Sequence, residues 1–376
     1  MSNQSQIRLE GVTKRWGASA AVDGISFDVT QGQFVILLGP SGCGKSTTLR
    51  MIAGLEEASD GQIHISERDV TRLPPGDRGL SMVFQSYALF PHLSVADNIV
   101  FGLRSRKVPK AEQRQRLAKV AELVDLTDYL NRKPGQLSGG QRQRVALARS
   151  IISEHPICLM DEPLSNLDAR LRSDMRREIK ALQSRLNMTV IYVTHDQVEA
   201  MSMGDRVILM QHGKIVQDGT PGELYNRPAS AFAASFIGSP AMNLLPLVAG
   251  ENGAVIEGEP STPVAPLEAA GGHLGIRPED VELRIAPGSG VPANVLSEEY
   301  LGADTIAYVA VGSYTLRVRL SGKQTLTGQP CSLYWTSQNT HLFDAEGLRR
   351  DDLTPPPLPS SSRSIPRPPA VGSFQH

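Results

Sequence analysis

The sequence has few cysteines and no long apolar run. Its three cysteines, Cys43, Cys158 and Cys331, are odd in number and far apart, a pattern that suggests neither a disulfide framework nor a zinc site. We therefore expect the protein to reside in a reducing cytosol. No run approaches the ~18–20 apolar residues that a membrane-spanning helix needs, and the polar N-terminus lacks the apolar stretch of a signal peptide. Any membrane role must come through a partner.

A strong net charge is also lacking. The chain carries 38 Lys and Arg against 39 Asp and Glu, so there is no general electrostatic case for nucleic acid as a partner. One local exception is a basic cluster within residues 104–119. We interpret it as a solvated helix face, with a surface near lipid headgroups or a membrane partner as the alternative. The cluster comprises Arg104, Arg106, Lys107, Lys110, Arg114, Arg116 and Lys119.

The 376 residues are too many for one typical domain and fit two. Short apolar runs alternate with helical patterns through the first two-thirds, at 34–38, 81–84, 157–160, 190–193 and 207–210. Unbroken runs are typical of strands buried on both faces, so this part predicts a parallel α/β core. Residues 93–149 break the alternation and are predicted to be helical throughout. Apolar residues at helical spacing within 171–186 predict an amphipathic crossover helix.

After about residue 240, short β-like runs separated by Gly and Pro replace the helical patterns. The runs 291–296, 305–311, 314–320 and 332–335 predict a small all-β, barrel-like (OB-like) domain. From Asp351 onward Pro and Ser dominate, which predicts a disordered tail, with a proline-motif ligand as the alternative. We place the α/β domain at 1–238, with a helical subdomain at about 93–150, the β-rich domain at 239–350 and the tail at 351–376.

A phosphate-binding loop is the first chemical motif. It follows the predicted strand 34–38 and opens a predicted helix from Lys45 to about Ala53, the context that the pattern G-x-x-x-x-G-K-[ST] requires. Backbone amides and the helix N-terminus attract phosphate. Lys45 should reach the β- and γ-phosphates of a nucleoside triphosphate, and Ser46 should ligate Mg²⁺. The residues are Gly39, Pro40, Ser41, Gly42, Cys43, Gly44, Lys45, Ser46 and Thr47.

Polar residues also follow three other predicted strands. Asp161 and Glu162 follow 157–160; Asp161 is predicted to hold Mg²⁺ through water, and Glu162 to orient or deprotonate an attacking water. Alone, the two acids could simply end a strand. Gln85 and His195 follow their own strands, where such residues are usually ordinary loop residues. Because ligands bind beyond the carboxyl ends of strands in open α/β sheets, we expect all four to face one crevice.

The pentapeptide Leu137-Ser138-Gly139-Gly140-Gln141 lies between the phosphate loop and the two carboxylates. Elsewhere it would be read as an ordinary helix N-cap with a flexible lead-in. Together, these motifs resemble those of the ATP-binding cassette (ABC) ATPases over about residues 7–345. The resemblance implies a head-to-tail homodimer in which Ser138, Gly139, Gly140 and Gln141 cover the ATP held by the other copy. It also implies that Asp168, in a segment 165–168 similar to the family's D-loop, crosses that interface.

The same resemblance assigns three more roles. Gln85 would lie at the Mg²⁺ and the attacking water, and His195 would contact the γ-phosphate. Trp16 falls where the family has an aromatic residue stacked on adenine; packing in the core is its alternative. Cys43 lies inside the loop, so modification of its thiol should block nucleotide by bulk.

The segments 236–243 and 275–280 resemble the junction and regulatory domain of bacterial carbohydrate importer ATPases, nearest to the maltose and sn-glycerol-3-phosphate subunits. That implies ATP hydrolysis with ATP and Mg²⁺ at the cytoplasmic face of the inner membrane. The implied partners are two integral-membrane permease subunits, which would dock on residues 85–102, and an extracytoplasmic solute-binding protein. Alternatives are import of another solute (spermidine or putrescine, sulfate, molybdate, ferric iron), a soluble ABC ATPase acting on DNA or ribosomes, and a binding module with a decayed ATPase.

Overall fold

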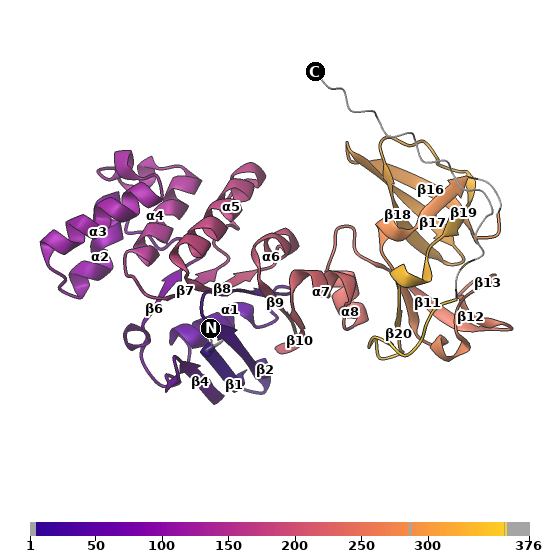
Figure 1. The fold of residues 1–376 in the computed structure, drawn as a ribbon, viewed down its shortest axis with the longest axis horizontal. Helices are drawn as coiled ribbons and strands as arrows, with labels where there is room; N and C mark the ends of the chain where they lie inside the picture. Colours follow the sequence, from indigo (N-terminus) through magenta and orange to yellow (C-terminus); the bar gives the residue numbers. More distant parts are fainter. Residues whose placement is uncertain (1–4, 286–287, 357, 359–376) are drawn as a thin grey trace, which may run out of the picture. The chain divides into compact units, whose positions relative to one another are not determined.

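The computed structural model describes residues 5–285, 288–356 and 358. The chain divides into two compact units, Met1–Arg227 and Pro228–His376 (Figure 1). The sequence placed this boundary between residues 238 and 239. The boundary in the structure lies earlier in the chain because α8 (Ala231–Phe236) belongs to the second unit. Its buried Ala234 packs with Met242 and Phe343 of that unit.

A six-stranded sheet forms the centre of the first unit. Its strands are β3 (Phe34–Leu38), β6 (Leu80–Val83), β7 (Ile157–Asp161), β8 (Thr189–Thr194), β9 (Arg206–Gln211) and β10 (Lys214–Gly219). They are ordered β10-β9-β3-β8-β7-β6, and only β10 runs antiparallel to its neighbour. Every residue of β3, β7 and β8 is buried, which explains their unbroken apolar sequences. The predicted parallel α/β core is confirmed.

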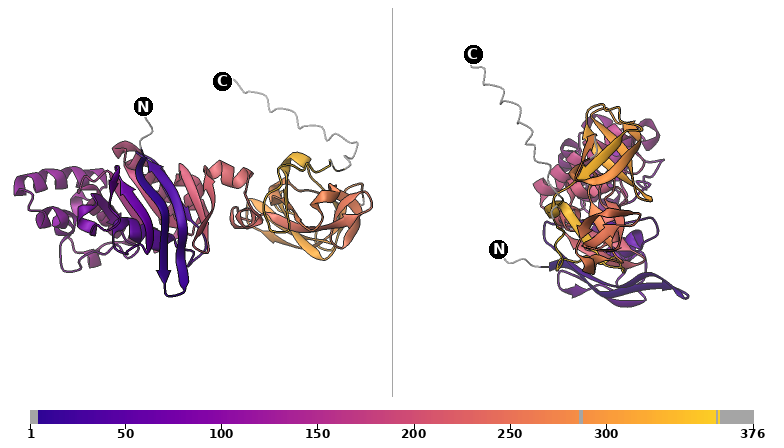
Figure 2. Two further views of the ribbon diagram at one scale, coloured as in Figure 1. Left: turned by 90° about the horizontal axis from the view of Figure 1, so that it is seen from below. Right: turned by 90° about the vertical axis from the view of Figure 1, so that its right-hand side faces the viewer.

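Helices and a second sheet cover the two faces of this central sheet. The helices α5 (Ala169–Leu186) and α6 (Gln197–Met203) lie on one face, and α1 (Lys45–Ala53) lies on the other (Figure 1). Beyond α1, an antiparallel sheet of order β2-β1-β4-β5 comprises β1 (Ser5–Trp16), β2 (Ser19–Thr30), β4 (Asp60–Ile65) and β5 (Arg68–Asp69). Figure 2 shows the long β1–β2 hairpin. One apolar core includes residues of both sheets and of α1.

Three helices form a separate subdomain with its own apolar core: α2 (Val95–Ser105), α3 (Lys110–Leu123) and α4 (Gly139–Ile151). The prediction of helix throughout 93–149 is wrong for residues 106–109, between α2 and α3, and for residues 124–138. That stretch holds only two short 3₁₀ turns, Thr127–Tyr129 and Pro134–Gln136. Pro134 starts the second turn and has no N–H to donate to a continuing α-helix, which is one reason for the break.

Three of the seven residues of the basic cluster have partners nearby on this subdomain. Arg104 lies 2.6 Å from Asp97, and Arg116 lies 2.8 Å from Glu154. Arg106 forms a hydrogen bond of 2.7 Å with His155. These contacts favour a solvated, ion-paired helix face over a surface that binds lipid headgroups.

The second unit is β-rich, as predicted. Its strands are all paired antiparallel and form two five-stranded sheets, ordered β13-β12-β11-β14-β20 and β15-β19-β16-β17-β18, which share one apolar core. The strands are β11 (Asn243–Gly250), β12 (Gly253–Ile256), β13 (Glu259–Ala265), β14 (His273–Ile276), β15 (Glu282–Ile285), β16 (Val291–Tyr300), β17 (Asp304–Val311), β18 (Tyr314–Ser321), β19 (Pro330–Tyr334) and β20 (Thr340–Phe343).

The chain beyond β20 begins on this same core. Leu353 and Leu358, at the start of the segment predicted to be a disordered tail, pack against it. The rest of that segment, residues 359–376, lies outside the described residues. Within the described ranges, no helix combines the length and the apolar character needed to span a membrane.

Candidate functional site

Four polar loops meet at one edge of the central sheet. They follow the carboxyl ends of β3, β8, β7 and β6, which are consecutive in the strand order. The register keeps these ends level, because Leu38 lies beside Thr194 and Asp161 lies beside Val193. The topology therefore brings the phosphate-loop motif to the same edge as Asp161, Glu162, His195 and Gln85, as expected for a ligand crevice.

The phosphate-loop turn needs glycine at two positions. Gly39 follows β3 with φ of +152°, and a Cβ there would lie 2.3 Å from the carbonyl oxygen of Met210. Gly44 has φ of +105°, and its Cβ would lie 2.5 Å from the carbonyl oxygen of Ala21. Gly44 is also the N-cap of α1 and supplies no side-chain cap. The first amides of α1 therefore face the turn made by Pro40, Ser41, Gly42 and Cys43, where an anion is favoured.

Lys45 is held inside this turn. Its ammonium donates hydrogen bonds of 2.8 Å to the carbonyl oxygens of Gly39 and Pro40, and the residue is only 5% exposed. The ammonium also lies 3.7 Å from the Cys43 Sγ. Burial raises the pKa of the Cys43 thiol, although the Lys45 charge opposes that shift. The loop thus keeps one positive charge beside a protonated thiol.

Ser46 and Asp161 make the next contact. The Ser46 hydroxyl donates a 2.7 Å hydrogen bond to Asp161 Oδ1. Ser46 and the neighbouring Thr47 lie in the first turn of α1. Asp161 is 5% exposed, and Arg50 lies 3.8 Å from its other oxygen. A hydroxyl and a carboxylate are oxygen ligands that Mg²⁺ prefers. Among the described residues no group of three or more His, Cys, Asp and Glu side chains is placed to hold a metal. A cation here would therefore need further oxygens from phosphate or water.

Glu162 and His195 form a second pair. His195 Nδ1 lies 3.2 Å from Glu162 Oε1, with the imidazole more exposed than the carboxylate. Glu162 has φ of +43°, a left-handed conformation that is uncommon for a non-glycine residue. Its N–H donates to the carbonyl oxygen of Val193, so the backbone of β8 fixes this bend. The carboxylate is therefore aimed at the loop that follows β8.

Gln85 is linked to the loop after β7 rather than to the phosphate-loop turn. Its side-chain amide donates to Ser165 Oγ at 3.3 Å, and Asn166 donates back to the Gln85 carbonyl oxygen at 3.0 Å. Ser165 Oγ donates in turn to the carbonyl oxygen of Glu162. These bonds tie Gln85 to the segment that carries the two acids.

The pentapeptide at the start of α4 forms a capping box. Ser138 Oγ accepts from the Gln141 N–H, and Gln141 Oε1 accepts from the Ser138 N–H. The adjoining glycines lie against α5 and its lead-in: a Cβ on Gly139 would be 3.1 Å from Leu167, and one on Gly140 would be 2.9 Å from Leu171. In the described part of the chain, no hydrogen bond or ion pair joins this segment to the phosphate-loop turn.

Asp168 and Trp16 occupy the edges of the site. Asp168 is the N-cap of α5 and accepts from the Leu171 N–H at 3.0 Å. Trp16 ends β1 and is 55% exposed, which excludes the alternative of core packing. The Lys14 ammonium lies 5.7 Å from its ring centroid. The ring is open to a stacking ligand.

Two charged residues of the site, Arg50 and Arg172, were not predicted from the sequence, and Asn166 was predicted only as part of the segment 165–168. Arg50 contacts Asp161, and Asn166 contacts Gln85. Arg172 donates to the Leu167 carbonyl oxygen and to Asp196. A helical spacing of four residues, from Ser46 to Arg50 and from Asp168 to Arg172, is the signal that could have indicated two of them.

Comparison with known families and proteins gives matches in both units. The family model described as ABC transporter matches residues 22–165, and the TOBE domain model matches residues 274–343. The sn-glycerol-3-phosphate import ATP-binding protein UgpC of Yersinia pseudotuberculosis is 47% identical over 352 residues, covering 91% of this chain and 98% of that protein. The trehalose/maltose import ATP-binding protein MalK of Thermococcus litoralis is 48% identical over 361 residues, covering 90% and 97%.

Solved structures match the first unit. An ATP-binding cassette solved as a dimer bound to ADP and phosphate matches with a TM-score of 0.51 and 30% identity, over 57% of this chain and 98% of that chain. The CbiO1 structure from Clostridium perfringens, described as part of an ABC transporter complex, matches with a TM-score of 0.55 and 26% identity, over 59% and 91%. The fold of the first unit is thus that of ATP-binding cassettes.

Proposed function

The chain belongs to the ATP-binding proteins of ABC transporters, and we propose that it is the ATPase subunit of an importer for a carbohydrate or sn-glycerol-3-phosphate. The observation that carries the proposal is identity of 47–48% to two import ATPases over nine-tenths of the chain, the β-rich second unit included. The site geometry supports the ATPase half of the proposal, and the named relatives support the solute class.

For ATP binding, we assign phosphate recognition to the turn 39–47. Its amides and the α1 N-terminus would cradle the phosphates, with Lys45 supplying positive charge and Trp16 stacking on the adenine. Ser46 and Asp161 would hold Mg²⁺, with Gln85 beside them. When bound, Mg²⁺ would neutralise charge on the β- and γ-phosphate oxygens.

For hydrolysis, we assign Glu162 as the general base that takes a proton from the attacking water. Its contact with His195 would hold the carboxylate and imidazole in one orientation, and His195 would contact the γ-phosphate. Gln85, tied to the Glu162 carbonyl through Ser165, would help to place the water. These assignments give each polar loop of the crevice one task in phosphoryl transfer.

The complete site, in this proposal, needs two copies. Ser138, Gly139, Gly140 and Gln141 would cover the ATP of the second copy, with Asp168 at the interface. The dimeric cassette to which the first unit is similar supports the pairing of two copies. We place the ATPase domain at 1–238 and a regulatory domain at 239–350.

The importer would work with two permease subunits, docked on 85–102, and a solute-binding protein. It would lie peripherally at the cytoplasmic face of the inner membrane. To test this, the tagged full chain is purified from detergent-solubilised membranes. Its permease is then reconstituted into vesicles with the binding protein and radiolabelled glycerol 3-phosphate, maltose or trehalose. We expect ATP-dependent uptake of one of these solutes, and none with Lys45→Met.

Two outcomes would contradict the proposal. Recovery of the chain with ribosomes or DNA, and without a permease, would favour the soluble ABC ATPase. Uptake of spermidine, sulfate, molybdate or ferric iron, and of no sugar or sugar phosphate, would keep the importer and refute the solute class.

A further inference from the structure

Arg172 connects two loops of the site that are far apart in sequence. It lies in the first turn of α5. One guanidinium nitrogen donates to the carbonyl oxygen of Leu167 at 3.1 Å, and the other donates to Asp196 Oδ2 at 3.3 Å. Leu167 immediately precedes Asp168, and Asp196 immediately follows His195. A single planar cation thus spans the two segments, 165–168 and 194–196.

Asp196 in turn holds the backbone around His195. Its Oδ1 accepts from the N–H groups of Val198 and Glu199, which caps α6. Its own N–H donates to Thr194 Oγ1 at 2.9 Å. Both chain neighbours of His195 are therefore fixed by hydrogen bonds, one of them directly to Arg172.

A buried carboxyl group completes the network. Glu199 is 3% exposed, and its Oε2 accepts from the Thr194 hydroxyl at 2.7 Å and from the Tyr192 hydroxyl at 2.8 Å. Buried polar groups that are satisfied in this way rigidify the segment that they join. The network approaches the surface at Arg172 and Asp196, whose side chains are partly exposed.

His195 depends on this backbone support. Its side chain is 55% exposed, and the Glu162 contact is the only polar contact of the imidazole among the described residues. A side chain with so few contacts takes its position from its Cα. Anything that shifts residues 194–196 therefore shifts the imidazole.

We propose that Arg172 is a positioning residue, which holds His195 in register with the segment 165–168. The inference rests on the proposed contact of His195 with the γ-phosphate. The segment 165–168 is also where the second copy is proposed to dock. Through Arg172, the docking of the second copy on the segment 165–168 therefore affects the position of His195 and, with it, the rate of hydrolysis.

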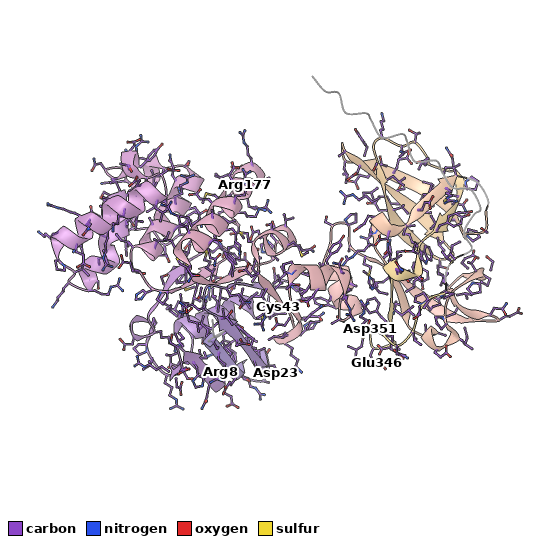
Figure 3. The ribbon with its side chains drawn as sticks, viewed as in Figure 1. Arg8, Asp23, Cys43, Arg177, Glu346 and Asp351 are labelled. Atoms are coloured by element: carbon purple, nitrogen blue, oxygen red, sulfur yellow. The ribbon has the colours of Figure 1, made fainter. Side chains whose placement is uncertain are left out.

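The test compares substitutions within α5, all in the full chain. Arg172→Met removes the guanidinium and keeps an unbranched side chain. We expect kcat to fall by about 10- to 100-fold, the cost of misplacing a reacting group by about 1 Å, while KM for ATP changes by less than about threefold. Arg172→Lys can keep only one of the two contacts, so its kcat should lie between that of the parent and that of Arg172→Met. The matched control is Arg177→Met, which removes an exposed arginine paired with Asp174 on the same helix and should leave both constants unchanged (Figure 3).

A double variant separates positioning from a merely structural role. If Arg172 acts through His195, single-turnover hydrolysis by His195→Ala should not fall further when Arg172→Met is added. If the losses of the two single variants multiply in the double variant, the proposal is overturned. Equal loss of ATP binding and of hydrolysis in both Arg172 variants would also overturn it. An unchanged rate in His195→Ala alone would instead refute the role of His195, and the inference with it. The single variant tells these failures apart.

Discussion

Glu162→Gln replaces the proposed general base with an amide of the same shape. The amide oxygen can still accept a hydrogen bond at the position of Oε1, 3.2 Å from His195 Nδ1. The backbone bond from the Glu162 N–H to Val193 is untouched. Because the imidazole is largely exposed, losing the charge at this contact should cost at most about 1 kcal/mol of unfolding free energy.

The effect on hydrolysis should be far larger. Removing a general base typically costs about 10²- to 10⁴-fold in rate, equivalent to ~3–5 kcal/mol of barrier height. The phosphate-loop turn, with Lys45 and Ser46, is unchanged, so ATP binding should persist. The variant should therefore hold ATP without consuming it and accumulate as an ATP-bound dimer.

Phosphate release and light scattering with ATP and Mg²⁺ measure the two outcomes. The matched control is Glu178→Gln, whose side chain is also 20% exposed and lies 2.9 Å from Arg144. Since Glu178 pairs with Arg144 and, among the described residues, forms no hydrogen bond or ion pair with a crevice loop, its loss should leave hydrolysis unchanged. A rate for Glu162→Gln within a few-fold of the parent would refute the general-base assignment. A monomer in the presence of ATP and Mg²⁺ would refute the two-copy site.

Three further predictions follow from single contacts. Ser46→Ala removes the hydroxyl bonded to Asp161. Because one oxygen ligand is lost, we expect the affinity for Mg²⁺, measured by Mg²⁺ titration with ATP present, to fall at least about tenfold. Gly39→Ala places a Cβ 2.3 Å from the Met210 carbonyl oxygen; urea denaturation should show a loss of about 2–4 kcal/mol. For His341, burial and then nearby guanidinium groups lower the pKa from 6.5 to about 4. The unfolded chain thus binds more protons between these values, so stability should fall by about 3 kcal/mol as the pH drops from 6.5 to 4. A His341→Gln variant should lack this component, and a pH dependence identical to that of the parent would contradict the assignment.

The sequence predicts the central sheet well because burial on both faces leaves an unbroken apolar run, as in β3 and β7. It does not predict the β1–β2 hairpin. Register shifts between Leu9 and Val12 and between Val12 and Lys14 interrupt the alternation by which an antiparallel strand is recognised. A pattern of period two cannot be read through such bulges.

In the candidate site, too, some residues could be predicted from the sequence and others could not. Residues that belong to a local motif, such as Lys45 and Glu162, could be named because the motif fixes both residue type and spacing. Contacts between elements could not. The bond from Arg172 to Asp196 joins residues 24 positions apart, and the bond from Asn166 to Gln85 joins residues 81 apart. Their pairing follows from the strand order, which no local pattern contains.

The left-handed backbone of Glu162 sets stability against activity at one position. A non-glycine residue in this conformation costs about 1 kcal/mol or more that glycine would not. Glu162→Gly should therefore relax the bend after β7 while removing the carboxylate that we propose as the general base. A selection for thermal stability alone would therefore favour glycine at this position. The bend is a place where the fold tolerates strain and directs the proposed general base towards the crevice.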